Sequence, residues 1–162
     1  RIIVTIDPRD LELAQICRAQ RAEVVLPERP PEDMKRSVLY GLQYIERRYQ
    51  PSAEAVWLMA PADLPFLSAA RIARLLAEQP ATPEKILVPR QAGRRGHPIL
   101  APWPVAAEVA RLPENGGLNA LLRDERIRLI DCADDGSDED LDTPADFARL
   151  QNRHPPINPQ NS

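Results

Sequence analysis

The sequence alternates between short apolar runs and longer segments in which apolar residues recur with helical spacing. The runs of strand length are residues 2–6, 24–26, 55–59, 86–89, 98–101 and 127–130. The segments of helical period are residues 11–21, 34–48, 68–78, 105–111, 118–123 and 145–151. Alternation of this kind is typical of a mainly parallel sheet with helices on both faces. We therefore expect an α/β fold built as a three-layer sandwich with a mostly parallel sheet.

Length and composition fit one globular domain. The chain has 162 residues, 43% of them hydrophobic and 28% charged, which is enough for a single core. We predict one domain over residues 1–152 and a disordered tail over residues 153–162, which are polar and proline-rich without periodicity. No run reaches the roughly 18 apolar residues of a membrane span, and no signal sequence precedes the first strand. We therefore expect a cytoplasmic protein without membrane contact.

Charge and cysteine usage exclude further classes. The formal net charge of −3 argues against a general nucleic-acid partner and leaves small anionic ligands as the expected partners. Cys17 and Cys132 lack CxxC spacing, so neither a metal cluster nor a disulfide framework is expected. Both cysteines are expected to be small packed residues.

Acidic residues cluster at two places in the sequence. Asp63 lies just beyond the apolar run 55–59, and ligands of open α/β sheets bind at the carboxyl ends of strands. Asp140, Asp142 and Asp146 crowd into seven residues near the end of the chain. Such carboxylates repel one another unless a cation shares them, and Mg²⁺ is usually held by one or two carboxylates plus substrate phosphates. We predict Asp63, Asp140 and Asp142 as metal ligands, although Asp63 alone also fits an ordinary turn. Asp146 is expected instead to stabilise the first turn of its helix.

A basic turn follows the run 86–89. Its residues are Arg95, Gly96, His97 and Pro98. Glycine allows close backbone approach and arginine binds phosphate bidentately, so this turn is a candidate binding site with His97 as a ligand contact. A solvated hairpin turn without a ligand explains the same residues equally well. Ser37, in the first turns of the helix expected at 34–48, is a further binding candidate, but no histidine motif makes it a nucleophile.

Five short motifs follow one another over about residues 1–150. They are Met34-Lys35-Arg36-Ser37-Val38 with Gly41-Leu42, Asp63-Leu64-Pro65, Arg95-Gly96-His97-Pro98, Gly117 with Leu121-Leu122, and Asp140-Leu141-Asp142-Thr143-Pro144-Ala145-Asp146. In this order they resemble the MobA-like nucleotidyltransferases, which include the molybdenum-cofactor cytidylyl- and guanylyltransferases. The resemblance implies a Rossmann-like fold of the nucleotide-diphospho-sugar transferase kind. It also implies that a nucleoside monophosphate passes from CTP or GTP to a phosphorylated acceptor such as molybdopterin, with Mg²⁺ as cofactor and pyrophosphate as product.

The resemblance assigns roles to individual residues. It implies that Asp63 is catalytic and binds the metal at the nucleotide α-phosphate, with Asp140 or Asp142 as the second acidic ligand. It also implies a group of residues on the acceptor side, namely Arg95, Gly96 and His97. A molybdoenzyme or its chaperone is the expected protein partner.

The sequence departs from the family pattern at two places. The family opens with a strand, a glycine-rich loop and a lysine that bind the triphosphate, and these have no counterpart here, so we expect them upstream. Asn115 and Asn119 stand where the family has an acid and an arginine. One alternative is therefore a non-catalytic relative that acts as a cofactor-binding or accessory domain. Another, a sugar-nucleotide synthesising enzyme of similar fold, fits Asp63 but explains Arg95, Gly96 and His97 less well.

Overall fold

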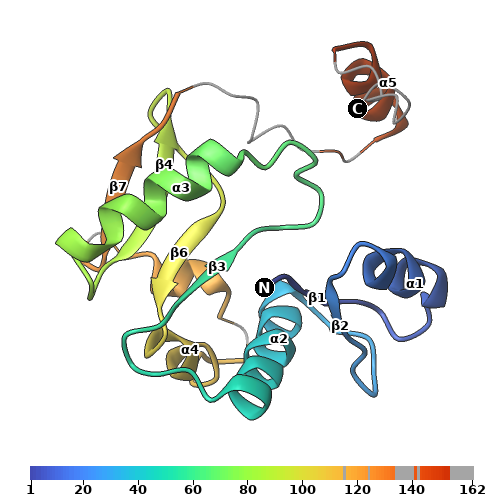
Figure 1. The fold of residues 1–162 in the computed structure, drawn as a ribbon, viewed down its shortest axis with the longest axis horizontal. Helices are drawn as coiled ribbons and strands as arrows, with labels where there is room; N and C mark the ends of the chain where they lie inside the picture. Colours follow the sequence, from blue (N-terminus) through green and yellow to red (C-terminus); the bar gives the residue numbers. More distant parts are fainter. Residues whose placement is uncertain (115, 124, 134–140, 142, 154–162) are drawn as a thin grey trace.

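The protein folds as an α/β structure with two sheets (Figure 1). A computed structural model describes residues 1–114, 116–123, 125–133, 141 and 143–153. The strands in this part of the chain are β1 (Ile3–Thr5), β2 (Glu23–Val25), β3 (Val56–Met59), β4 (Ile86–Gln91), β5 (Arg94–Arg95), β6 (Ile99–Pro102) and β7 (Ile127–Asp131). The α-helices are α1 (Leu11–Ala19), α2 (Met34–Tyr49), α3 (Ala69–Glu78), α4 (Val105–Val109) and α5 (Pro144–Arg153), and 3₁₀ turns form η1 (Gln79–Ala81) and η2 (Leu118–Leu121).

The smaller sheet consists of β1 and β2, which pair in parallel. Helix α1 connects them and begins at Asp10, whose carboxylate accepts a hydrogen bond from the Leu13 amide at 3.0 Å. Helix α2 follows β2 and is anchored to it through Glu23, which accepts hydrogen bonds from the hydroxyls of Tyr44 and Tyr49. These bonds lower the pKa of Glu23, and the Tyr49 contact is the largest cause.

The larger sheet has the strand order β3-β6-β4-β5, and β7 pairs in parallel with β4. Strand β6 runs antiparallel to both β3 and β4, so the expectation of a mostly parallel sheet is wrong here. The physical reason is the connection from β4 to β6. It is a short hairpin instead of the crossover of a dozen or more residues that parallel neighbours need. Strands β3, β4 and β7 still share one direction, with β6 inserted against it.

A tight turn between β4 and β5 reverses the chain direction ahead of β6. Its two residues, Ala92 and Gly93, have φ values of 47° and 80°, and the flanking pair Gln91 and Arg94 are cross-strand partners. Positive φ at both central residues is the geometry of a type I′ hairpin, whose twist matches that of the strands. The turn of the hairpin therefore lies just before Arg94 and Arg95.

Helices cover both faces of the larger sheet (Figure 1). Alternate residues of a strand point to opposite faces, so β4 sends Ile86 and Val88 to one side and Leu87 to the other. The side of Leu87 packs against Leu75 of α3. The opposite side packs against α2, α4 and η2, which contribute Leu42, Val105, Ala106, Val109 and Leu121.

Helix α5 begins with a reciprocal cap. The Asp146 carboxylate accepts hydrogen bonds from the Thr143 amide at 3.0 Å and the Thr143 hydroxyl at 2.7 Å, which lower the pKa of Asp146. Asp146 thus has the first-turn role expected from the sequence. The helix continues through Arg153, the residue at which the tail was expected to begin, and residues 154–162 lie outside the described part.

Two negative findings concern the described residues alone. None of their helices combines the length and apolarity needed to cross a bilayer. Cys17 and Cys132 are both half-buried, and they form no disulfide with each other.

Candidate functional site

Asp63 is exposed in the turn that follows β3. Its carbonyl oxygen accepts a hydrogen bond of 3.0 Å from the amide of Leu141. This bond joins the turn after β3 to a residue flanked by two of the predicted acidic ligands, although 78 positions separate the bonded residues. The turn after β3 and Leu141 are therefore in direct backbone contact.

The exposed carboxylate of Asp63 is a suitable ligand for a divalent cation. Carboxylate oxygens are the hard ligands that Mg²⁺ prefers, and Asp63 presents one at the protein surface. Asp140 and Asp142 lie outside the described residues, so the predicted shared site stays a prediction. Within the described residues, no three or more acids, histidines or cysteines gather in a way that could hold a metal ion.

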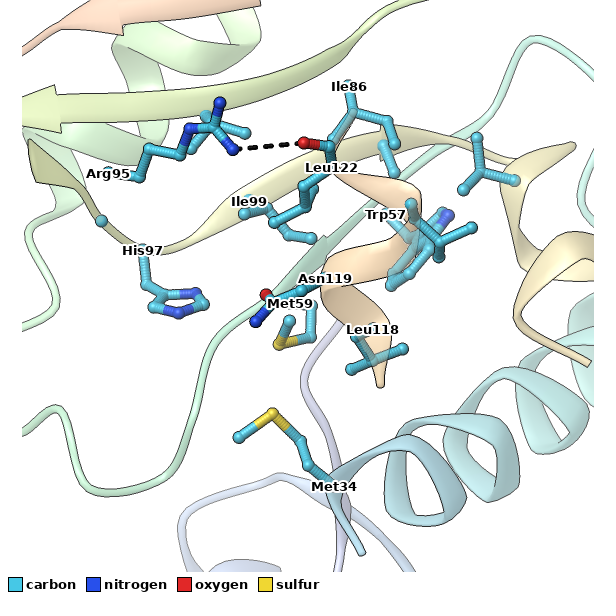
Figure 2. Close-up of a pocket in the computed structure, with 15 residues that line it drawn as sticks. Met34, Trp57, Met59, Ile86, Arg95, His97, Ile99, Leu118, Asn119 and Leu122 are labelled. Carbon is cyan, nitrogen blue, oxygen red and sulfur yellow. Dashed lines mark hydrogen bonds between the residues drawn. The ribbon is translucent and has the colours of Figure 1, made fainter. Parts of the chain in front are cut away.

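A cavity of about 610 Å³ opens on the α2 and α4 side of the larger sheet (Figure 2). The side chains that form its apolar interior are Trp57, Met59, Ile86, Val88, Ile99, Ala101, Val105, Leu118, Leu121 and Leu122. Met34, at the start of α2, lies at its open side across from His97. The cavity thus sits between the sheet, the start of α2 and the turn η2.

The polar rim of this cavity brings three predicted residues together. Arg95, Gly96 and His97 all line it, and Asn119 of η2 joins them. Two hydrogen bonds fix the rim: Arg95 Nη1 donates to the Leu122 carbonyl at 3.2 Å, and the Gly96 amide donates to the Pro89 carbonyl at 2.9 Å. Arg90, the cross-strand partner of Arg95, is paired with Asp131 at 2.7 Å, which lowers the pKa of Asp131.

Ser37 lies elsewhere on α2. It is half-buried, its amide donates to the Asp33 carbonyl at 3.1 Å, and it does not line this cavity. The structure therefore does not bring Ser37 to the rim, and its binding role stays a prediction.

Arg71 of α3 supports the rim from the other face of the sheet, and sequence reasoning did not single it out. Arg71 is only 2% exposed. Its guanidinium donates to the His97 carbonyl at 3.1 Å and to the Gln91 side-chain oxygen at 2.7 Å. The sequence signal that could have indicated its burial is helical spacing. Arg71 stands four residues before Leu75, so both lie on the same face of the helix.

Lys35 fixes the loop that leads into η2. Its ammonium donates to the Pro113 carbonyl at 2.6 Å and the Glu114 carbonyl at 2.8 Å. Lys35 therefore ties the start of α2 to this loop. A smaller cavity of about 240 Å³ lies beside this contact and shares Met34, Leu118 and Asn119 with the larger one.

Solved structures resemble this fold over most of the chain. Rv0371c from Mycobacterium tuberculosis H37Rv matches with a TM-score of 0.68 and 24% identity, covering 94% of this chain and 75% of that one. A second structure of Rv0371c is a complex with manganese. A CMP:2-keto-3-deoxy-manno-octonic acid synthetase complexed with CTP matches with a TM-score of 0.71 and 14% identity, covering 94% and 80%. Molybdopterin-guanine dinucleotide biosynthesis protein A from Archaeoglobus fulgidus matches with a TM-score of 0.60 and 17% identity, covering 93% and 77%.

Sequence comparison identifies the family. The comparison with curated proteins gives no match. Residues 1–130 match the MobA-like NTP transferase domain, which is most of the chain and includes the turn of Asp63 and the whole rim of the larger cavity. The chain therefore belongs to the MobA-like NTP transferase family, a family of nucleotidyltransferases.

Proposed function

We propose that the protein transfers a nucleoside monophosphate from CTP or GTP to a phosphorylated acceptor such as molybdopterin and releases pyrophosphate. The observation that carries the proposal is the hydrogen bond between the Leu141 amide and the Asp63 carbonyl. It supports a site in which acids from two distant segments serve one ligand, and positioning of the reacting groups is what lowers the barrier of such a transfer. The reaction would take place in the cytoplasm, and a molybdoenzyme or its chaperone would receive the product.

The chain's own residues would act by positioning and by charge. Asp63, with Asp140 and Asp142, would hold Mg²⁺, which when bound neutralises charge on the triphosphate. Arg95 and His97, on the rim of the larger cavity, would orient the acceptor phosphate. An oxygen of that phosphate then attacks the nucleotide α-phosphorus, and the bond to the β-phosphate breaks as pyrophosphate leaves. No protein nucleophile is required.

Replacing the acid tests the proposal directly. In Asp63→Ala and Asp63→Asn, pyrophosphate release with CTP or GTP, Mg²⁺ and acceptor is expected to fall by at least about a hundredfold, because a positioned charge of the site is lost. Glu84→Gln is the control, since Glu84 is also exposed in a turn but lies before β4. Circular dichroism establishes that each variant is folded. Turnover retained in a folded Asp63→Ala protein would remove Asp63 from the mechanism.

A further inference from the structure

The larger cavity combines an apolar interior with a basic rim. We propose that it binds a phosphate monoester whose non-phosphate part is apolar, with the phosphate at Arg95 and the apolar part inside. The inference rests on the proposed function, whose phosphorylated acceptor supplies the anion that the rim fits. It narrows that acceptor to one less polar than molybdopterin, because a pterin carries hydrogen-bonding groups that the apolar interior does not match.

The interior walls belong to the hydrophobic core. Trp57, Ile86, Val88, Ile99 and Ala101 reach the cavity from three neighbouring strands, and each is at most 9% exposed. Such walls offer water few hydrogen-bond partners, so ordered water gains little there. Exchange of that water for apolar groups of a ligand is favourable in proportion to the apolar area covered.

The rim selects for negative charge. Among the described residues that line the cavity, Arg95 carries the one formal charge and none is a carboxylate. Figure 2 places Arg95 and His97 on one side of the cavity and Met34 on the other, with Met59 and Asn119 between them. A ligand that reaches inward from the rim therefore passes from a basic and polar border to an apolar interior.

Size and polarity distinguish the acceptor from the nucleotide. A volume of about 610 Å³ falls within the range of roughly 300 to 1,000 Å³ that is usual for small-molecule sites. The base and ribose of CTP or GTP carry many hydrogen-bonding groups, and burying these against apolar walls without partners is costly. The interior therefore suits the less polar of the two substrates.

A homologous series of ligands tests this assignment. We would measure by calorimetry the affinities of inorganic phosphate and of butyl, hexyl and octyl phosphate, without nucleotide or metal. Each added methylene buried in the cavity is expected to tighten binding roughly fourfold, until the interior is filled. The heat capacity change on binding should become more negative along the series.

Variants distinguish the part of the cavity that would bind the apolar group from the part that would bind the phosphate. Leu118→Gln, in η2, is expected to flatten the dependence on chain length. Met34→Gln provides the same test at a residue that is 53% exposed, where the change removes little buried apolar surface. Leu76→Gln is the control on the opposite face, because Leu76 is an exposed leucine of α3 that does not line the cavity. Its chain-length dependence should equal that of the unmodified protein.

Arg95→Gln is expected to weaken every member of the series by about the same factor, roughly tenfold, because one charge-assisted contact to phosphate is lost. Arg94→Gln is the matched control. Arg94 is the exposed neighbour of Arg95 in β5 and does not line the cavity. Equal losses in Arg94→Gln and Arg95→Gln would indicate non-specific attraction and overturn the assignment of the rim.

The outcomes for the cavity and for the reaction are separable. Affinity that does not rise with chain length, or that rises equally in folded Leu118→Gln and Met34→Gln proteins, overturns the inference even if Asp63 proves essential for transfer. Binding that follows chain length and Arg95 supports the cavity assignment even if no nucleotidyl transfer is found.

Discussion

The two faces of the larger sheet differ in how completely they are filled. On the face covered by α3, Leu75, Leu87 and Leu100 are fully buried, at 0% exposure. On the opposite face, Ile99 borders a cavity of about 610 Å³, although it is the immediate neighbour of Leu100 in β6. Because successive strand residues point to opposite faces, one strand contributes to the packed core on one side and to the proposed binding site on the other.

The filled face also contributes to the site through one residue. Arg71 stands at the start of α3 and donates to the carbonyl of His97, on the rim of the cavity. A helix that is held by a close-packed interface gives this arginine a fixed position. The two faces therefore differ in role: one is close-packed, and the other carries the cavity that we propose as the acceptor site.

The largest expected effect comes from truncating neighbours on the two faces. Leu100→Ala is expected to reduce the free energy of unfolding by about 4 kcal/mol and Ile99→Ala by about 2 kcal/mol. Both changes remove a large aliphatic side chain, but Ile99 already borders empty space and loses fewer contacts. Urea unfolding of both variants measures the difference. Equal costs would mean that the cavity face is packed as tightly as the α3 face.

The sequence predicted the elements that this comparison uses. The helix expected at 34–48 is α2, Met34–Tyr49, and the run at 86–89 is the start of β4, Ile86–Gln91, because both patterns reflect local periodicity. The antiparallel direction of β6 was missed. An apolar run has no direction of its own, and only the short hairpin before it sets which way it pairs.

The site was predictable where its residues are adjacent in the sequence. Arg95, Gly96 and His97 were singled out as one turn, and they line one cavity. The supporting contacts of Arg71 and Lys35 were not predictable, because each joins residues far apart in the chain. Lys35, for example, binds the carbonyl of Pro113, 78 positions away. Helical spacing could have indicated that Arg71 faces the sheet, but no local pattern identifies the distant carbonyls that Arg71 and Lys35 bind.

Substitution of Arg71 tests whether the α3 face supports the cavity face. Arg71→Met is expected to lower the free energy of unfolding by about 2 kcal/mol, because the His97 carbonyl and the Gln91 side chain lose a buried donor. Arg71→Lys should recover part of this loss. Arg74→Met, at an exposed position of the same helix, should change stability by less than about 0.5 kcal/mol. Similar losses in the two methionine variants, measured by urea unfolding, would show that the contacts of Arg71 contribute nothing specific.

His97 tests the cavity face as an acceptor site. His97→Ala is expected to raise the KM for the acceptor roughly tenfold, the effect of one lost hydrogen bond, and to change the KM for the nucleotide much less. The reason is its position, since His97 lines the cavity that we assign to the acceptor. Steady-state kinetics with each substrate varied in turn separate the two constants. A larger effect on the nucleotide KM would place His97 on the other side of the reaction.

The smallest expected effect concerns an ion pair at the edge of the cavity face. Glu108 of α4 accepts hydrogen bonds from Arg126, one of them at 2.8 Å, and these lower the pKa of Glu108 below its usual 4.5. Because the pKa is lower in the folded protein, the stabilisation is complete above about pH 4.5 and is lost as the pH falls through the folded value. The Glu108 side chain is 38% exposed, so water screens the pair and its contribution should stay below about 1 kcal/mol. In Glu108→Gln, urea unfolding at pH 7 and pH 3 should show a smaller loss of stability on acidification than in the unmodified protein. Equal losses would mean that the ion pair contributes nothing measurable to stability and that α4 is held by its buried residues.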